Sequence, residues 1–225
     1  MLSILYDFIC FSIIGYIAEI FHCGIRGYKS GKALRGPWCP LYGLGGILII
    51  LALKPFRNNI ILIYLVGVVI ATITEYYVSL VLEKIFKTRW WDYSNVKYNL
   101  NGRICLRNSL LFGILSIVLY YIYLPLKGIL LEKIDIITIN AITLAIAIIM
   151  LIDGVFTVLD ALELKKRIDL VDKIGIKNKD KIHKKLSKLK ETYDYKRLLK
   201  NYDFRDKRTK FLKKYYKLKS HFINK

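Results

Sequence analysis

The sequence predicts an all-α membrane protein, a bundle of about five transmembrane helices followed by a basic, amphipathic helical tail. Three observations predict it. Several apolar runs are nearly free of charge and reach the roughly 20 residues that a helix needs to cross a bilayer. Lone acids interrupt two of them, Glu75 in residues 60–82 and Asp153 in residues 136–159. Finally, 23 of the 37 Lys and Arg residues fall in the last quarter of the chain.

Charge divides the chain into two unlike parts. Residues 1–164 carry 14 Lys and Arg against 10 Asp and Glu, whereas residues 165–225 carry 23 against 7. A single soluble domain is excluded, because the apolar runs are too long and too free of charge. We expect residues 1–164 to form the transmembrane bundle and residues 165–225 to form the tail.

The expected crossings are residues 2–21, 39–54, 60–82, 108–126 and 136–159. The first has no basic segment before it and no small-residue cleavage site after it, which predicts a retained anchor. The second is the weakest, because its strictly apolar part of 13 residues reaches only about 20 Å as a helix. It either spans the bilayer by including residues 38–40, or it enters and leaves the membrane on the same side.

Positive charge predicts the orientation. The segments after the first and third crossings are rich in Lys and Arg, as is the tail, whereas the two other loops hold few. Five crossings place these three basic segments on one side, which the positive-inside rule assigns to the cytoplasm. We therefore expect a multi-pass protein of the cell membrane, with the N-terminus outside and the C-terminal tail in the cytoplasm.

Polar residues recur at helical spacing on three crossings. They are Glu75, Ser79 and Glu83; Asp153, Thr157 and Asp160; and Gly15, Glu19 and His22. Each trio occupies one helical face, and a carboxylate in hydrocarbon is a functional candidate because it is costly there. We predict one inward-facing cavity in which a polar or cationic substrate contacts Glu75, Asp153, Ser79, Thr157 and Glu19. The alternative is that the acids pair with Arg26, Arg103 or Arg107 and only fix helix packing.

Residues 89–105, between the third and fourth crossings, form the most distinctive loop, rich in aromatic and hydrogen-bonding side chains. An anchor at the membrane interface accounts for its two tryptophans but not for its polar residues. We predict a loop that gates the path or contacts a partner through Trp90, Trp91, Asp92, Tyr93, Asn101 and Arg103.

The residues that open the second crossing, 36–43, contain Pro37, Trp38 and Pro40. The two prolines remove backbone donors and stiffen the chain, and the tryptophan suits the interface. This pattern indicates a rigid interfacial turn more strongly than a substrate loop.

Enzyme chemistry finds little support in the sequence. Residues 27–33 imitate a phosphate-binding loop, but they have one residue too few between the glycines and Ala33 in place of Ser or Thr. The four cysteines and His22 lack the spacing of a metal site. We therefore expect no metal, no cofactor and no hydrolysis of nucleotide by this chain.

The tail predicts one or two basic amphipathic helices. Residues 176–225 contain no Gly and no Pro, and Ile182, Leu186 and Leu189 recur at helical spacing. Three interpretations compete: a solvated helical hairpin, contact with anionic lipid headgroups of the inner leaflet, and binding of a protein or nucleic acid. We favour contact with the leaflet, and we expect no nucleic acid because no known binding motif is present.

The loops resemble those of a family of bacterial integral membrane proteins described as putative ABC-transporter type IV. The resemblance is carried by residues 36–40, 42–43, 75–76, 82–84, 90–94, 101–106 and 109, and it covers about residues 5–160. It implies a permease, that is, the membrane subunit of a transporter with a separate cytoplasmic ATPase.

Three functions follow as hypotheses. The first is a permease-like subunit of an ABC-type transporter for a polar or cationic substrate. The second is a membrane-embedded enzyme acting on lipid headgroups, with Asp92, Glu83 or Glu75 as acid or base. The third is a non-catalytic membrane scaffold anchored by its tail.

Overall fold

The computed structural model describes residues 2–25, 34–56, 59–87, 89–175, 178–189, 193–201 and 207–223. The apolar part of the chain forms α1 (Leu2–Ile25), α2 (Pro40–Leu53), the short 3-10 turn Lys54–Phe56, α3 (Ile60–Phe86), α4 (Leu106–Val118), a π-helical turn (Leu119–Tyr123), α5 (Leu124–Lys133) and α6 (Ile136–Ile174). The tail forms α7 (Lys179–Lys188), α8 (Tyr195–Asn201) and α9 (Lys207–Ile223). A two-stranded antiparallel hairpin, β1 (Asn99–Leu100) and β2 (Ile104–Cys105), precedes α4. The predicted all-α fold is confirmed.

Four stretches are long and apolar enough to cross a membrane: Leu2–Phe21, Ile60–Phe86, Leu106–Lys133 and Ile136–Ile174. The second expected crossing corresponds to α2, which has 14 residues and therefore measures about 21 Å, short of a hydrocarbon core of about 30 Å. It packs between α1 and α3. The sequence correctly marked it as the weakest crossing.

The fourth crossing is longer than the predicted 108–126, because α4 continues through the π-helical turn into α5 and reaches Lys133. Pro125 has no backbone N–H and cannot bond the carbonyl of Tyr121. The helical turn that precedes Pro125 is therefore wider than an α-helical turn. In it, the Leu124 N–H donates to the Leu119 carbonyl, five residues back. The helix is thus adjusted around the proline without ending.

Helices α3 and α4 pack closely at two glycines. A Cβ at Gly67 would overlap the Ser116 hydroxyl, and a Cβ at Gly113 would lie 2.6 Å from the Tyr64 ring. Small residues allow membrane helices to approach at such distances.

We expect Gly67→Leu to push α3 and α4 apart and to lower the free energy of unfolding by about 1–3 kcal/mol. Unfolding by sodium dodecyl sulfate in mild detergent micelles measures the change. Gly128→Leu on α5 is the matched control, because a Cβ at Gly128 meets no atom within 4 Å. Equal stability of the two variants would contradict the close packing.

The fifth crossing continues well past the predicted residue 159. Helix α6 has 39 residues, about 58 Å, and ends at Gly175, whose φ is +79°. The predicted division at residue 164 therefore lies within one helix. The extension is stabilised by a core that α6 forms with the tail: Ala161, Leu164, Ile168 and Val171 contact Ile182, Leu186, Tyr195, Leu198 and Leu212.

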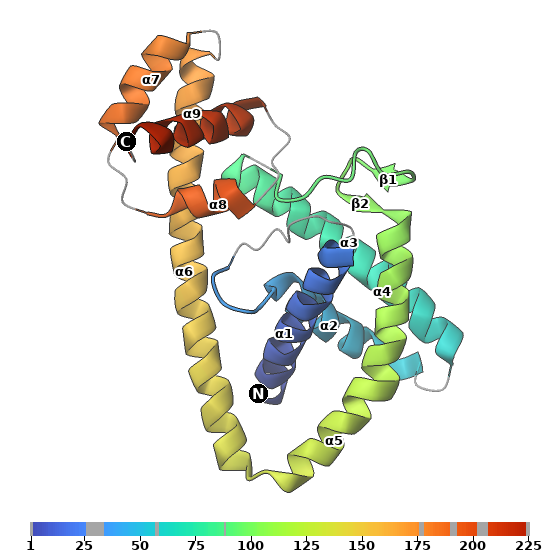
Figure 1. The fold of residues 1–225 in the computed structure, drawn as a ribbon. Helices are drawn as coiled ribbons and strands as arrows, with labels where there is room; N and C mark the ends of the chain where they lie inside the picture. The colour runs from blue at the N-terminus through green and yellow to red at the C-terminus, as the bar shows by residue number, and fades with distance from the viewer. Residues whose placement is uncertain are drawn as a thin grey trace.

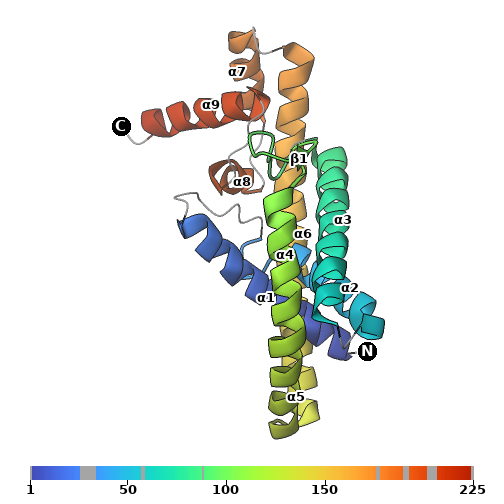
Figure 2. The ribbon, with the colours of Figure 1, turned by 90° about the vertical axis from the view of Figure 1, so that its right-hand side faces the viewer.

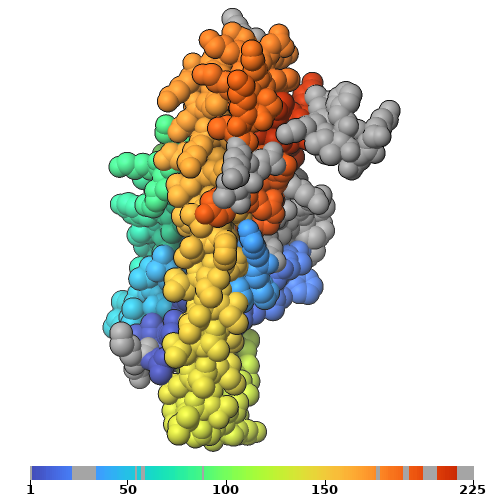
Figure 3. All heavy atoms as spheres, turned by 90° about the vertical axis from the view of Figure 1, so that its left-hand side faces the viewer, coloured from blue at the N-terminus to red at the C-terminus, as the bar shows by residue number. Residues whose placement is uncertain are grey.

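The described part of the tail contains three helices, not the one or two that we expected. They fold back on the upper part of α6, as Figures 1 and 3 show. Because the tail is divided into three separate helices, Ile182, Leu198 and Leu212 all reach the face of α6 that carries Ile168. The tail is therefore a packed unit and not an isolated hairpin.

One end of the bundle carries the hairpin β1–β2 and the tail, while the turn between α5 and α6 lies at the other end (Figures 1 and 2). The segment that precedes α2 lies beside the middle of α6. The basic loop and the basic tail thus share an end, as the alternating crossings require. This end is where the side chains of the candidate site meet the loops.

Candidate functional site

Asp153 on α6 holds the segment that precedes α2. Its carboxylate is 8% exposed and accepts the backbone N–H groups of Arg35 at 2.9 Å and Gly36 at 2.8 Å. The indole Nε1–H of Trp38 donates to it at 2.9 Å, and the Thr157 hydroxyl at 3.5 Å. Both carboxylate oxygens are therefore occupied by the chain itself.

The sequence around Trp38 explains this conformation. A Cβ at Gly36 would overlap the Trp38 ring, so only glycine lets the ring fold over the backbone. Pro40 begins α2, where a proline costs no helical hydrogen bond. The Cys39 N–H donates to the Ser12 carbonyl of α1 at 2.8 Å, and Glu19 of α1 lies near the Cys39 thiol. The predicted rigid turn thus bridges α1 and α6.

Asp160, two turns along α6, joins the same segment to the tail. It is fully buried and lies 3.1 Å from Nη2 of Arg35 and 3.0 Å from Nη2 of Arg197 on α8. The backbone N–H of Asp194 donates to it at 2.9 Å. One carboxylate therefore connects the bundle, the segment before α2 and the tail.

Glu75 on α3 has a different environment. Its side chain is 4% exposed, and Oε1 accepts a hydrogen bond of 3.1 Å from the Tyr93 hydroxyl. Oε2 is buried and accepts no hydrogen bond from any described residue. Burial, followed by the charge of Glu75, raises the pKa of the Tyr93 phenol well above its usual value, so the phenol stays protonated and donates.

The loop 89–105 covers the polar face of α3. Arg103 forms an ion pair of 2.6 Å with Glu83 and donates to the Ser79 hydroxyl at 3.3 Å. The Asn101 amide donates to the Tyr76 hydroxyl at 3.0 Å. The loop therefore contacts α3 along the whole stripe that starts at Glu75.

A tight turn gives the loop its shape. Asn101 and Gly102 both have positive φ angles, 53° and 68°, and a Cβ at Gly102 would meet Ser94 and Asp92. The Trp91 indole donates to the Arg103 carbonyl at 2.9 Å. Trp90 points towards the tail core, with its ring 5.4 Å from that of Phe86.

The structure thus sorts the predicted site residues into two groups. Glu75 and Ser79 lie under the loop that contains Tyr93 and Arg103, whereas Asp153 and Thr157 lie under the segment 34–39; Glu19 lies beside that segment. Of the expected structural pairs, Arg103 with Glu83 is present. Arg26 and the side chain of His22 fall outside the described parts of the chain.

Sequence reasoning missed three partners in this arrangement. Arg35, Asp194 and Arg197 bind Asp160 from parts of the chain that are far away in sequence. The only available signal was the surplus of arginine near buried acids, and the sequence does not specify which arginine pairs with which acid.

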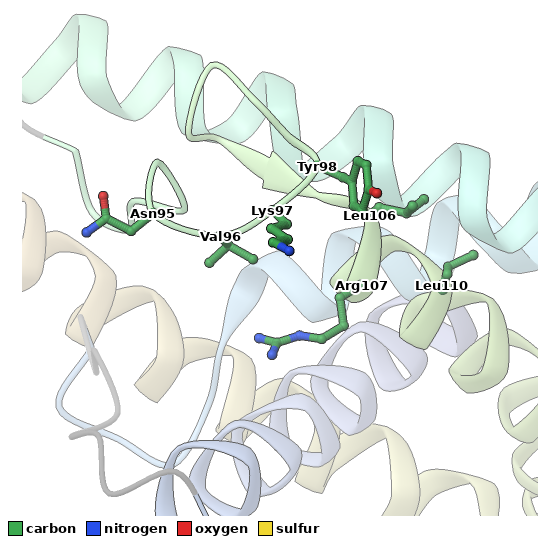
Figure 4. Close-up of a pocket in the computed structure, with 7 residues that line it drawn as sticks. All are labelled: Asn95, Val96, Lys97, Tyr98, Leu106, Arg107 and Leu110. Carbon is green, nitrogen blue, oxygen red and sulfur yellow. The ribbon is translucent and has the colours of Figure 1, made fainter.

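A pocket of about 560 Å³ lies elsewhere, between residues 95–98 of the loop and the first turns of α4 (Figure 4). Its lining includes Lys97, Tyr98, Leu106 and Arg107, but neither Glu75 nor Asp153.

Fold and site together define an α-helical membrane protein in which two loops are docked on acidic helix faces. Residues 6–158 match the model of the family described as Putative ABC-transporter type IV. The match covers more than half of the chain, and the chain belongs to this family. No curated protein and no solved structure matches it.

Proposed function

We propose that this protein is the permease-like membrane subunit of an ABC-type transporter for a polar or cationic substrate, and that Glu75 contacts this substrate. One observation carries the proposal: within α3, Glu75 is buried with an oxygen that no described residue satisfies. Membership of the family supports the transporter class.

The contrast with Asp153 supports Glu75 as the group that binds a ligand. A buried carboxylate is costly unless donors or cations surround it. Asp153 receives its donors from Arg35, Gly36 and Trp38, so it acts as an anchor. Among the described residues Glu75 receives one donor, Tyr93, and a cation or an N–H or O–H donor of the substrate would complete its coordination.

The other predicted residues have supporting roles in this proposal. Ser79 positions Arg103, Thr157 supports Asp153, and Glu19 lies near Cys39 of the segment before α2. The loop 89–105 connects Glu75 to the surface at the basic end of the bundle. We propose that this end faces the cytoplasm and that the loop contacts a separate ATPase there.

Co-purification tests the subunit role. The full chain, tagged and extracted from its native membranes in mild detergent after chemical cross-linking, should bring down a protein that hydrolyses ATP. A sample that carries out no ATP hydrolysis and holds no nucleotide-binding protein would contradict the proposal.

We expect Glu75→Gln to reduce transport-dependent growth or uptake about tenfold or more, because loss of a hydrogen bond to a charged group weakens binding by roughly 1.5–3 kcal/mol. The measurement is complementation of a strain that lacks the protein. The glutamine side chain keeps the size of the glutamate and can still accept the Tyr93 hydrogen bond, so stability should be retained.

Glu132→Gln is the matched control, because Glu132 lies exposed on α5 and loses the same charge. Full complementation by Glu75→Gln, at equal protein level, would show that Glu75 is not part of the substrate site.

A further inference from the structure

We propose that the pocket between the hairpin and α4 binds the headgroup of an anionic phospholipid. The proposal concerns a different surface from the substrate site and from the tail, and it does not depend on the transport function. It rests on the positive charge of the pocket, on a row of exposed apolar side chains that continues from the pocket along α4, and on the aromatic side chain beside the pocket.

The pocket presents two cations that no acid in the described part of the chain neutralises. Lys97 and Arg107 line it, both are exposed, and neither forms an ion pair with a described acid. Arg89 and Arg103 of the same loop differ, because both are paired with Glu83. Figure 4 shows Lys97 and Arg107 on one side of the pocket and Leu110 on the other.

This pair of side chains suits a phosphate. An arginine guanidinium binds two phosphate oxygens at once through its parallel N–H groups, and a lysine ammonium adds a point charge. The pocket volume of about 560 Å³ lies in the range of small-molecule sites. The Asn95 side chain, which also lines the pocket, adds a hydrogen-bonding group for a polar headgroup.

An apolar stripe continues from the pocket along the membrane-spanning helix. Leu106, Leu110 and Ile114 follow at a spacing of four residues and are 49%, 42% and 52% exposed. They lie in the stretch Leu106–Lys133, which is apolar enough to cross a bilayer. An acyl chain can lie along this stripe while the phosphate stays between Lys97 and Arg107, which favours a lipid over a free phosphate ion.

The hairpin itself has the form of an interfacial anchor. Tyr98 is 79% exposed and is held in a left-handed conformation, with φ at 54°. Its carbonyl accepts the Leu106 N–H at 3.0 Å, which fixes the hairpin to the start of α4. Exposed aromatic rings at such positions favour the headgroup level of a bilayer. Tyr98 would thus place the two cations at the depth of the lipid phosphates.

The test uses the purified full chain in detergent and native mass spectrometry. The probes are dioctanoyl phosphatidylglycerol, dioctanoyl phosphatidylcholine and inorganic phosphate. We expect the protein to prefer the anionic lipid, and the double variant Lys97→Gln with Arg107→Gln to bind it about 25-fold more weakly, at about fivefold for each charge. Arg107→Lys alone should weaken binding less than Arg107→Gln, because it keeps the charge and loses only the two parallel N–H groups.

The matched control is Lys213→Gln with Lys214→Gln on α9, which removes the same charge from two exposed positions of the tail. It should change binding less than twofold. Equal affinity for the two lipids, unchanged binding by the pocket variant, or an equal loss in the tail control would overturn the proposal. Displacement of the lipid by inorganic phosphate at equal concentration would also overturn it, since the site would then be one for a free anion.

Discussion

Replacing Asp160 by alanine should lower the free energy of unfolding by about 3 kcal/mol, because Arg35 and Arg197 both lose the buried carboxylate with which they are paired. Asp160 is fully buried and serves Arg35, Arg197 and the Asp194 N–H. The Arg197 side chain is only 16% exposed and gains little water in exchange. The Arg35 side chain, at 45% exposed, can be hydrated again and contributes less.

Unfolding by sodium dodecyl sulfate in mixed micelles measures this loss. The same variant should release the tail, so that proteases cut between α7 and α9 sooner than in the original protein. Asp169→Ala is the matched control on the same helix, because the pair of Asp169 with Lys87 is exposed and should be worth less than about 1 kcal/mol. Similar losses in both variants would show that Asp160 does not join the tail to the bundle.

Asp153→Asn should free the segment before α2 and cost about 2–3 kcal/mol, because hydrogen bonds to a charged group are the stronger ones. Asparagine keeps one acceptor oxygen but turns an NH₂ group towards the donors of Arg35, Gly36 and Trp38. Trypsin should then cut the bond between Arg35 and Gly36 about 30- to 150-fold faster, since a local opening that is easier by about 2–3 kcal/mol is more populated by that factor.

Mass spectrometry of the tryptic fragments identifies the cut bond. Asp135→Asn is the matched control, because Asp135 caps the start of α6 through the N–H groups of Ile137 and Thr138, and asparagine caps a helix about as well as aspartate does. If Asp153→Asn is cleaved at the same rate as the original protein, Asp153 is not the anchor of this segment. Asp153 would then again be a candidate for contact with the substrate.

The transmembrane part of the fold was predictable because hydrocarbon imposes a simple rule. A helix must satisfy its own backbone there, so run length and charge alone indicate the four long apolar helices and single out α2 as the short one. The extension of α6 beyond residue 159 was not predictable from hydropathy. It follows from Leu164, Ile168 and Val171, which are part of an amphipathic stripe whose partner in the tail the sequence does not name.

Periodicity also identified the polar faces of the site, but not their partners. Glu75 and Ser79 do share a face, as do Asp153 and Thr157, because helical geometry fixes it. The contacts of Asp153 with Arg35 and of Glu75 with Tyr93 depend on how two irregular segments fold. Such conformations depend on Gly36 and Gly102, and their tertiary contacts leave no periodic trace in the sequence.

Helix α6 gives the protein a mechanical connection between two environments. Asp153 and Asp160 lie on a helix that runs without a break from Ile136 to Ile174. A tilt or rotation of the tail would therefore move both carboxylates together. The hydrogen bonds between Asp153 and the segment around Trp38 would lengthen or shorten with that movement of the tail.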